Sequence, residues 1–142
     1  MKISERWLRE WADPAGDVQA IAEALTLGGL EVDDITPAGP RLDGVVVGEV
    51  RAVAARGDAA NLRVCAVFDG AGVRQIVCGA PNVRAGLRTA LAQPGTTMAN
   101  GLAIAVSRIR GVESQGMLCS LAELGLGDDA AGIVELPADA AA

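Results

Sequence analysis

The sequence contains no histidine, which removes the most common general base and the most common metal ligand. Cysteine is scarce: Cys65, Cys78 and Cys119 are odd in number and form no CxxC pair, which argues against structural zinc and a disulfide framework. No apolar run approaches the roughly eighteen residues of a membrane span. Residues 1–7 mix charges of both signs, unlike an export signal. We therefore expect a cytoplasmic protein with reduced thiols and no membrane partner.

The charged side chains are unevenly distributed along the chain. The net charge is −6, yet residues 41–111 hold nine arginines and only four acids. Residues 1–40 hold three bases and eight acids, and residues 112–142 hold six acids and no base. Because salt limits the reach of a charge to about 10 Å, a polyanion responds to local charge rather than to the total. The central segment is therefore a candidate for binding nucleic acid.

Two short helices are predicted near the N-terminus. Capping residues precede residues 5–11 and 18–27, and a Gly-Gly pair ends the second helix. Trp7 and Trp11 share one face of the first helix. They have two interpretations, a stripe that docks a partner or the core of a platform, and the core is favoured. Helices this short need a partner surface, so we expect them to form part of a platform. Residues 30–35 then alternate between apolar and polar side chains.

Short apolar segments separated by turn residues predict a small closed β-barrel. A short helix over residues 121–124 and a last strand over 133–136 are expected to follow it. The predicted fold class is α+β, with a five-stranded β-barrel inserted in a small α+β platform made from both chain ends. The five barrel strands are expected over residues 45–54, 62–68, 73–78, 88–92 and 102–110.

Alternation also predicts which side chains face the barrel interior. In the first strand, Gly48 is interpreted as a bend or bulge, and Val46, Val50 and Ala52 share one face. In the second strand, the expected inward residues are Leu62, Val64, Ala66 and Phe68, and the expected outward residues are Arg63 and Cys65.

Several blocks of the chain resemble a known family. The blocks at residues 62–64, 76–82 and 110–118 are similar to the tRNA-binding OB domain found in several tRNA ligases and their accessory proteins. Because the flanks match as well, the whole chain resembles the N-terminal region of the bacterial phenylalanine–tRNA ligase β subunit. The flanking blocks are residues 7–11, 29–33, 123–126 and 133–139.

The resemblance implies a domain organisation and a set of partners. An OB-fold tRNA-binding domain over residues 41–120 would lie between a helical part of the platform, residues 1–40, and a return to the platform, residues 121–142. The chain would be a truncated fragment of an ATP- and Mg²⁺-dependent ligase. That ligase would be an α2β2 tetramer, so the implied partners are tRNA, the α subunit and the remainder of the β subunit. The fragment itself is expected to hold no catalytic residue, cofactor or metal.

Arginines and polar residues of the barrel form the predicted RNA-contact set. Arg108 and Arg110 are two residues apart and are expected on one face of a strand, while Arg63 and Arg88 lie on other strands. The alternative is that these arginines only solvate the barrel wall. The complete set is Arg56, Asn61, Arg63, Arg88, Arg108, Arg110, Ser114 and Gln115.

Two features limit how this barrel would bind RNA. The loop before the second strand has Arg56 where the family usually has histidine, and Asn61 replaces a lysine that the family offers to phosphate. Phe68 is the barrel's only aromatic residue and is expected inside, so binding should depend on charge and shape rather than on stacked bases.

Residues 113–117 have two interpretations. Their polar groups would meet ribose or phosphate in a functional loop, or Gly111 and Gly116 would take positive φ around a turn capped by Ser114. The turn is favoured. The acidic residues 128–129 lack the ligand spacing of a calcium loop, so no metal site is expected there.

Three functions are compatible with the sequence. The favoured one is an accessory tRNA-binding module of phenylalanine–tRNA ligase, which performs no chemistry itself. The alternatives are a free-standing protein that binds tRNA in trans, and a structural interaction domain within the ligase that never touches RNA.

Overall fold

The computed structural model describes residues 1–55 and 61–141. The chain forms two compact units, the first being Met1–Ala38 and the second beginning at Gly39. Each unit is described by itself below. In the described part of the chain, no helix has the length and apolar character required to cross a membrane.

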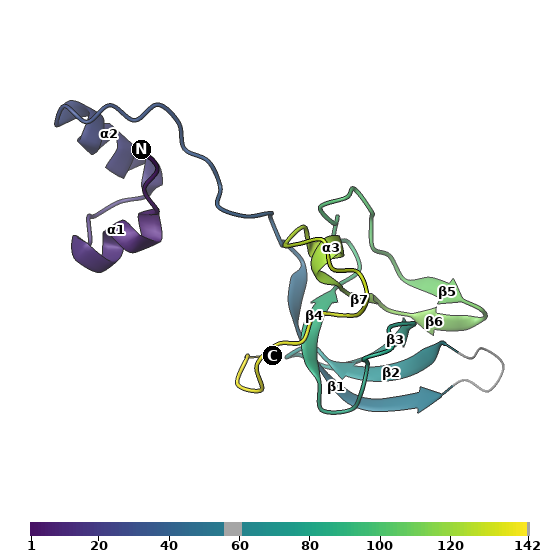
Figure 1. The fold of residues 1–142 in the computed structure, drawn as a ribbon. Helices are drawn as coiled ribbons and strands as arrows, with labels where there is room; N and C mark the ends of the chain where they lie inside the picture. Colours follow the sequence, from purple (N-terminus) through teal and green to yellow (C-terminus); the bar gives the residue numbers. More distant parts are fainter. Residues whose placement is uncertain (56–60, 142) are drawn as a thin grey trace. The chain divides into compact units, whose positions relative to one another are not determined.

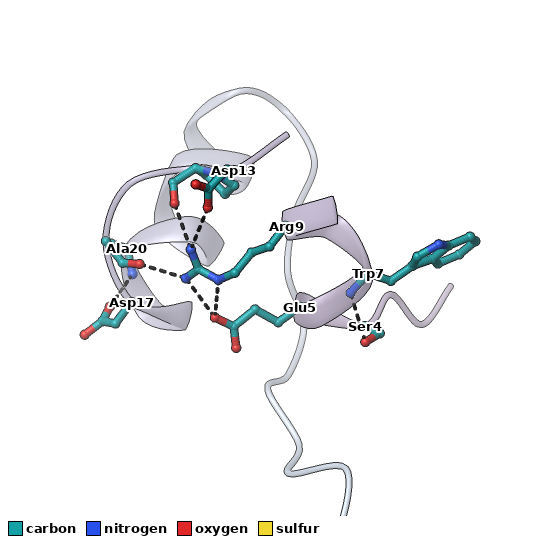
Figure 2. A network of polar contacts seen from close by, with 9 residues as sticks. Ser4, Glu5, Trp7, Arg9, Asp13, Asp17 and Ala20 are labelled. Carbon is teal, nitrogen blue, oxygen red and sulfur yellow. Dashed lines mark hydrogen bonds and ion pairs between the residues drawn. The ribbon is translucent and has the colours of Figure 1, made fainter. Parts of the chain in front are cut away.

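The first unit contains the two predicted helices, α1 (Glu5–Trp11) and α2 (Val18–Leu27). Both caps form: Ser4 Oγ accepts a hydrogen bond from the Trp7 amide, and Asp17 Oδ1 accepts one from the Ala20 amide at 3.0 Å. The Arg9 side chain joins α1 to the interhelical loop (Figure 2), donating to Glu5 Oε1 and to the carbonyls of Pro14 and Gly16. These hydrogen bonds hold the loop against α1.

The prediction that Trp7 and Trp11 form a core is wrong. Their side chains are 61% and 80% exposed, and Trp7 points away from the Arg9 network in Figure 2. Ile21 is the only buried residue among residues 1–38. The polar network on Arg9 occupies the side of α1 that faces the loop, so the tryptophans face outward. Residues 30–35 form no strand despite their alternating pattern.

The second unit is a nearly closed antiparallel barrel (Figure 1), which confirms the predicted five-stranded barrel and the α+β class. Its sheet has the strand order β3-β2-β1-β4-β7. The barrel interior is filled mainly by aliphatic side chains and cysteines from these strands and from the β3–β4 connection. The strands are β1 (Val45–Ala55), β2 (Arg63–Phe68), β3 (Val73–Cys78), β4 (Arg88–Ala92) and β7 (Met117–Leu118).

A β-bulge changes the direction of the side chains along β1. Val50 pairs with Val67 and Ala52 pairs with Ala66, so Arg51 is the extra residue. After the bulge Val53, rather than the predicted Ala52, packs against the core. Gly48 lies before the bulge, where a Cβ atom would come within 2.8 Å of Val67 Cγ1. Glycine is required there by close packing.

The predicted inward face of β2 is wrong. Cys65 and Val67 are fully buried, while Val64, Ala66 and Phe68 are only half-buried on the other face. The Arg51 guanidinium group covers the Phe68 ring, with its central carbon 5.0 Å from the ring centroid. Burial raises the pKa of the Cys65 thiol to about 11, so this cysteine is an inert core residue.

The expected single strand over residues 102–110 is also wrong. Within that range the structure has one strand, β5 (Ser107–Ile109), which pairs with β6 (Val112–Ser114) as a separate hairpin, and an isolated bridge from Ala103 to Thr97. The fifth barrel strand is instead the two-residue β7, which pairs with β4. Met98 and Ile104 of the preceding loop turn inward into a second core over the outer face of β4, together with Leu124.

The C-terminal segment packs against the barrel. The helix α3 (Leu121–Leu124) begins with a capping box formed by Ser120 and Glu123. Residues 133–136 form a single bridge, Arg88 to Leu136, rather than a strand, and the Val134 amide donates to the Cys119 carbonyl at 2.9 Å. This segment therefore belongs to the same unit as the barrel. The platform shared by both chain ends, and the boundaries 1–40, 41–120 and 121–142, stay predictions.

Candidate nucleic-acid interface

Among the arginines of the predicted contact set that the structure describes, the two on the β5–β6 hairpin are the exposed ones. Arg108 lies on β5 opposite Glu113 of β6, and all three β5 side chains are exposed. Arg110 and Gly111 form a two-residue turn with φ angles of +48° and +83°. Arg110 therefore lies at the tip of the hairpin. The prediction that Arg108 and Arg110 share one face of a strand is wrong.

Two other members of the predicted set lie near the start of β2. Asn61 is exposed just before this strand. Arg63 is half-buried, and its Nη1 donates to the carbonyls of Pro81 and Val83 at 3.3 and 2.8 Å. The hairpin extends toward this same end of the β2–β3 pair (Figure 1). We call the exposed residues Asn61, Arg108 and Arg110 the hairpin end of the barrel. Arg56 lies outside the described residues.

Arg88 does not belong to the hairpin end. Along β1, Arg88 pairs with Glu49 and Arg63 pairs with Ala55. Six residues of strand separate the two positions by about 20 Å. The Arg88 side chain also faces other partners, because Nη2 lies 3.8 Å from Glu49 Oε2 and Nη1 donates to the Ala140 carbonyl. Arg88 and the two arginines of the hairpin therefore do not share one face of the barrel.

Several further arginines of the barrel are paired with carboxylates. Arg51 contacts Glu49 at 3.1 Å, and Arg74 contacts the fully buried carboxylate of Asp69. Arg84 forms a bidentate pair with Glu135, which lowers the pKa of this carboxyl from 4.5 to about 2, helped by a hydrogen bond from Asn82. These pairs neutralise much of the central positive charge locally. The exposed arginines of the hairpin therefore dominate the candidate interface.

Ser114 and Gln115 close the barrel. Ser114 is 1% exposed, and its Oγ accepts from the Val77 amide at 3.0 Å and donates to the Gly116 carbonyl at 2.9 Å. Gln115 Oε1 accepts from the Gln75 amide at 3.3 Å. Of the two interpretations of residues 113–117, the structure supports the turn. Because Ser114 is buried among these hydrogen bonds, it is not carried forward as an RNA contact.

Gly116 explains why this turn approaches the barrel so closely. Its φ is +142°, and a Cβ atom there would lie 2.6 Å from the Ala92 carbonyl oxygen. Only glycine fits this combination of dihedral angle and space. The same turn keeps β7 paired with β4.

Asn82 is a structural residue that no sequence pattern marked beyond its place in a family block. Its Oδ1 accepts from the Ile133 amide at 3.0 Å and its Nδ2 donates to the Ile133 carbonyl at 2.8 Å. The side chain thus pairs with the main chain as a strand would. A Cβ atom on Gly132 would lie 2.5 Å from Asn82 Oδ1, so this pairing requires that glycine. The Pro81-Asn82 turn therefore anchors the C-terminal segment.

No cluster of three or more cysteine, aspartate or glutamate side chains that could hold a metal ion occurs among residues 1–55 and 61–141. The acidic loop has a local role instead, because Asp129 Oδ1 accepts from the Ala131 amide at 2.9 Å. Stacking of bases has little support, since Arg51 covers the Phe68 ring. What the hairpin end offers a ligand is positive charge.

Comparison with known proteins agrees with this geometry. Residues 45–142 match the family described as "Putative tRNA binding domain". Over 140 residues, the chain is 51% identical to the phenylalanine–tRNA ligase beta subunit of Pseudomonas fluorescens, and over 141 residues it is 47% identical to that of Pseudoalteromonas translucida. Each alignment covers 99% of this chain but only 18% of the relative. On the match of its barrel, this chain belongs to the tRNA-binding domain family.

Proposed function

We propose that the barrel binds tRNA as an accessory domain of a phenylalanine–tRNA ligase. The observation that carries this proposal is the coincidence of the family match with an OB-type barrel whose β5–β6 hairpin presents Arg108 and Arg110 to solvent. Guanidinium groups bind phosphate oxygens with two donors each, so an exposed pair on one arm suits an RNA backbone.

The binding mode follows from what the surface provides. The hairpin end offers two arginines and the amide of Asn61, and the barrel's single phenylalanine is covered by Arg51. Recognition is therefore of backbone charge and of the shape of a folded RNA, with little direct reading of bases. Of the predicted set, Arg63, Arg88 and Gln115 are assigned supporting roles, because their side chains bond within the barrel.

The similarity to ligases extends through both units of the chain. This favours a domain within the ligase over a free-standing protein that acts in trans. In that setting the ligase would be a cytoplasmic α2β2 tetramer that includes the α subunit. Aminoacylation would use ATP and Mg²⁺ in parts of the enzyme outside this domain. This domain would prolong the residence of tRNA on the enzyme and contribute no catalytic group.

Kinetics of the full-length ligase test the accessory role. Replacing Arg108 and Arg110 by alanine should raise the KM for tRNA roughly 5- to 30-fold, because each exposed charge contact is worth about 0.5–1 kcal/mol. Phenylalanine-dependent ATP–pyrophosphate exchange, which needs no tRNA, should stay unchanged. Arg84→Ala removes an arginine paired with Glu135 and serves as the control. An unchanged KM for tRNA would favour a purely structural domain.

A further inference from the structure

The outer edge of β3 is held by an unusual set of hydrogen bonds. β3 is the terminal strand of the five-stranded sheet, so its outward main-chain groups have no ladder partner within it. Two of its amides instead find side chains: Gln75 donates to Gln115 Oε1 and Val77 donates to Ser114 Oγ. The Gln75 carbonyl accepts from the Gln115 amide at 2.8 Å.

Gln75 adds a bond of its own to this edge. Its side-chain Nε2 donates to the Glu113 carbonyl at 2.8 Å, and Gln115 Nε2 donates to Glu113 Oε1 at 3.0 Å. Main-chain and side-chain atoms of one residue of β3 therefore bond to both ends of the segment 113–115. Hydrogen bonds on either side of Ser114 restrain the direction of this segment as well as its position.

That segment is the base of the β5–β6 hairpin. Glu113 pairs directly with Arg108, and Arg110 follows Arg108 by two residues, at the tip of the hairpin. The β5 side chains are all exposed, so β5 has no apolar core of its own to orient it. The orientation of the hairpin on the barrel depends on the bonds at its base.

We propose that Gln75 is a positioning residue for tRNA binding, acting through Arg108 and Arg110. With Gln115, it sets the direction in which the hairpin presents the two guanidinium groups to a phosphate backbone. This inference rests on the proposed function. It assigns to Gln75 a role that sequence reasoning missed, and it changes the role of Gln115 from RNA contact to support.

A double-mutant cycle tests the inference, using fluorescence anisotropy with an unmodified phenylalanine tRNA transcript. The proteins compared are the wild type, Gln75→Ala, the Arg108→Ala/Arg110→Ala pair, and the variant with all three substitutions. Gln75→Ala should weaken binding about 2- to 10-fold, as expected for removal of one hydrogen bond. In the background that lacks both arginines, the same change should have no effect, because nothing remains to be positioned.

The controls separate positioning from loss of structure. Val73→Ala removes an exposed side chain from the same strand and should leave binding unchanged. Gln75→Glu keeps the length of the side chain but turns an acceptor toward the Glu113 carbonyl, and should weaken binding at least as much as Gln75→Ala. Circular dichroism and the urea midpoint verify that each variant is folded.

Two results would overturn the inference. One is an equal loss of affinity from Gln75→Ala in both backgrounds, which indicates a general structural effect. The other is no loss from Gln75→Ala although the arginine pair proves necessary. If removing both arginines leaves affinity unchanged, the proposed interface itself fails. That outcome comes from comparing the wild type with the Arg108→Ala/Arg110→Ala pair, in which Gln75 is unchanged.

Discussion

The Ser114 hydroxyl accepts a hydrogen bond from the Val77 amide at 3.0 Å, in the position where a neighbouring strand would offer a carbonyl. Since Ser114 is buried, removing this oxygen leaves the Val77 amide without an acceptor in the barrel wall. We expect Ser114→Ala to lower the free energy of unfolding by about 2 kcal/mol. Urea denaturation of the whole chain measures this.

Ser107, exposed on β5, provides the matched control. Ser107→Ala should change the free energy of unfolding by less than about 0.5 kcal/mol. Hydrogen exchange at the Val77 amide should accelerate in Ser114→Ala and not in Ser107→Ala. Equal stability of the two variants would show that Ser114 does not close the barrel.

Asp69 makes the stability of the barrel dependent on pH. Its buried carboxylate accepts hydrogen bonds from Arg74, from the amides of Gly72 and Ala71, and from Gln93 Nε2 at 3.0 Å. The bond from Arg74 and then that from Gly72 hold the pKa of Asp69 well below its ordinary value of 3.8. Because the pKa of Asp69 is lower in the folded state, the ionised carboxylate stabilises the fold fully at pH values above the unfolded-state pKa. This contribution is lost as the pH falls from the unfolded-state pKa through the folded-state pKa.

We therefore expect Asp69→Asn to cost about 2 kcal/mol of unfolding free energy at neutral pH. The difference from the wild type should shrink below about pH 4, as the unfolded wild-type chain takes up its proton. Thermal unfolding between neutral pH and pH values below about 4 measures this difference in stability. Asp43→Asn, at an exposed position in a loop, is the control. A difference that stays constant with pH would contradict the assignment.

Thr89 is a fully buried residue of β4 whose Oγ1 has no hydrogen-bond partner among the described residues. Because burying an unpaired hydroxyl is costly, Thr89→Val should stabilise the chain by about 1 kcal/mol. Thr96 gives an opposite control: its Oγ1 donates to the Gly44 carbonyl at 2.9 Å, so Thr96→Val should destabilise by a similar amount. If both variants lose stability, Thr89 is hydrogen-bonded in solution.

Parts of the fold with strong local signals could be predicted from the sequence. The caps at Ser4 and Asp17 marked both N-terminal helices, and α3 begins at the predicted residue. The orientation of β2 could not be predicted, because apolar residues occupy every position from Val64 to Phe68 and alternation has no phase there. Its pairing with β1, shifted by the bulge at Arg51, determines which residues are buried. The two-residue strand β7 is too short to leave a pattern.

The candidate site was predictable in its charge but not in its geometry. Nine arginines in one segment pointed to a basic barrel, and Arg108 and Arg110 are indeed exposed. The partners of Arg88 are Glu49, far away in sequence, and a carbonyl of the C-terminal segment. The partners of Arg63 are also carbonyls, which every residue carries and no sequence pattern marks. Long-range pairing of this kind requires coordinates.

The salt dependence of tRNA binding tests the central claim most directly. For the whole chain and an unmodified phenylalanine tRNA transcript, the logarithm of the association constant should fall linearly with the logarithm of salt concentration. Arg108→Ala with Arg110→Ala should weaken binding and make that slope shallower by about 2, one for each phosphate that is no longer neutralised. Arg84→Ala should leave the slope unchanged. A slope identical in the wild type and the hairpin double variant would contradict the account.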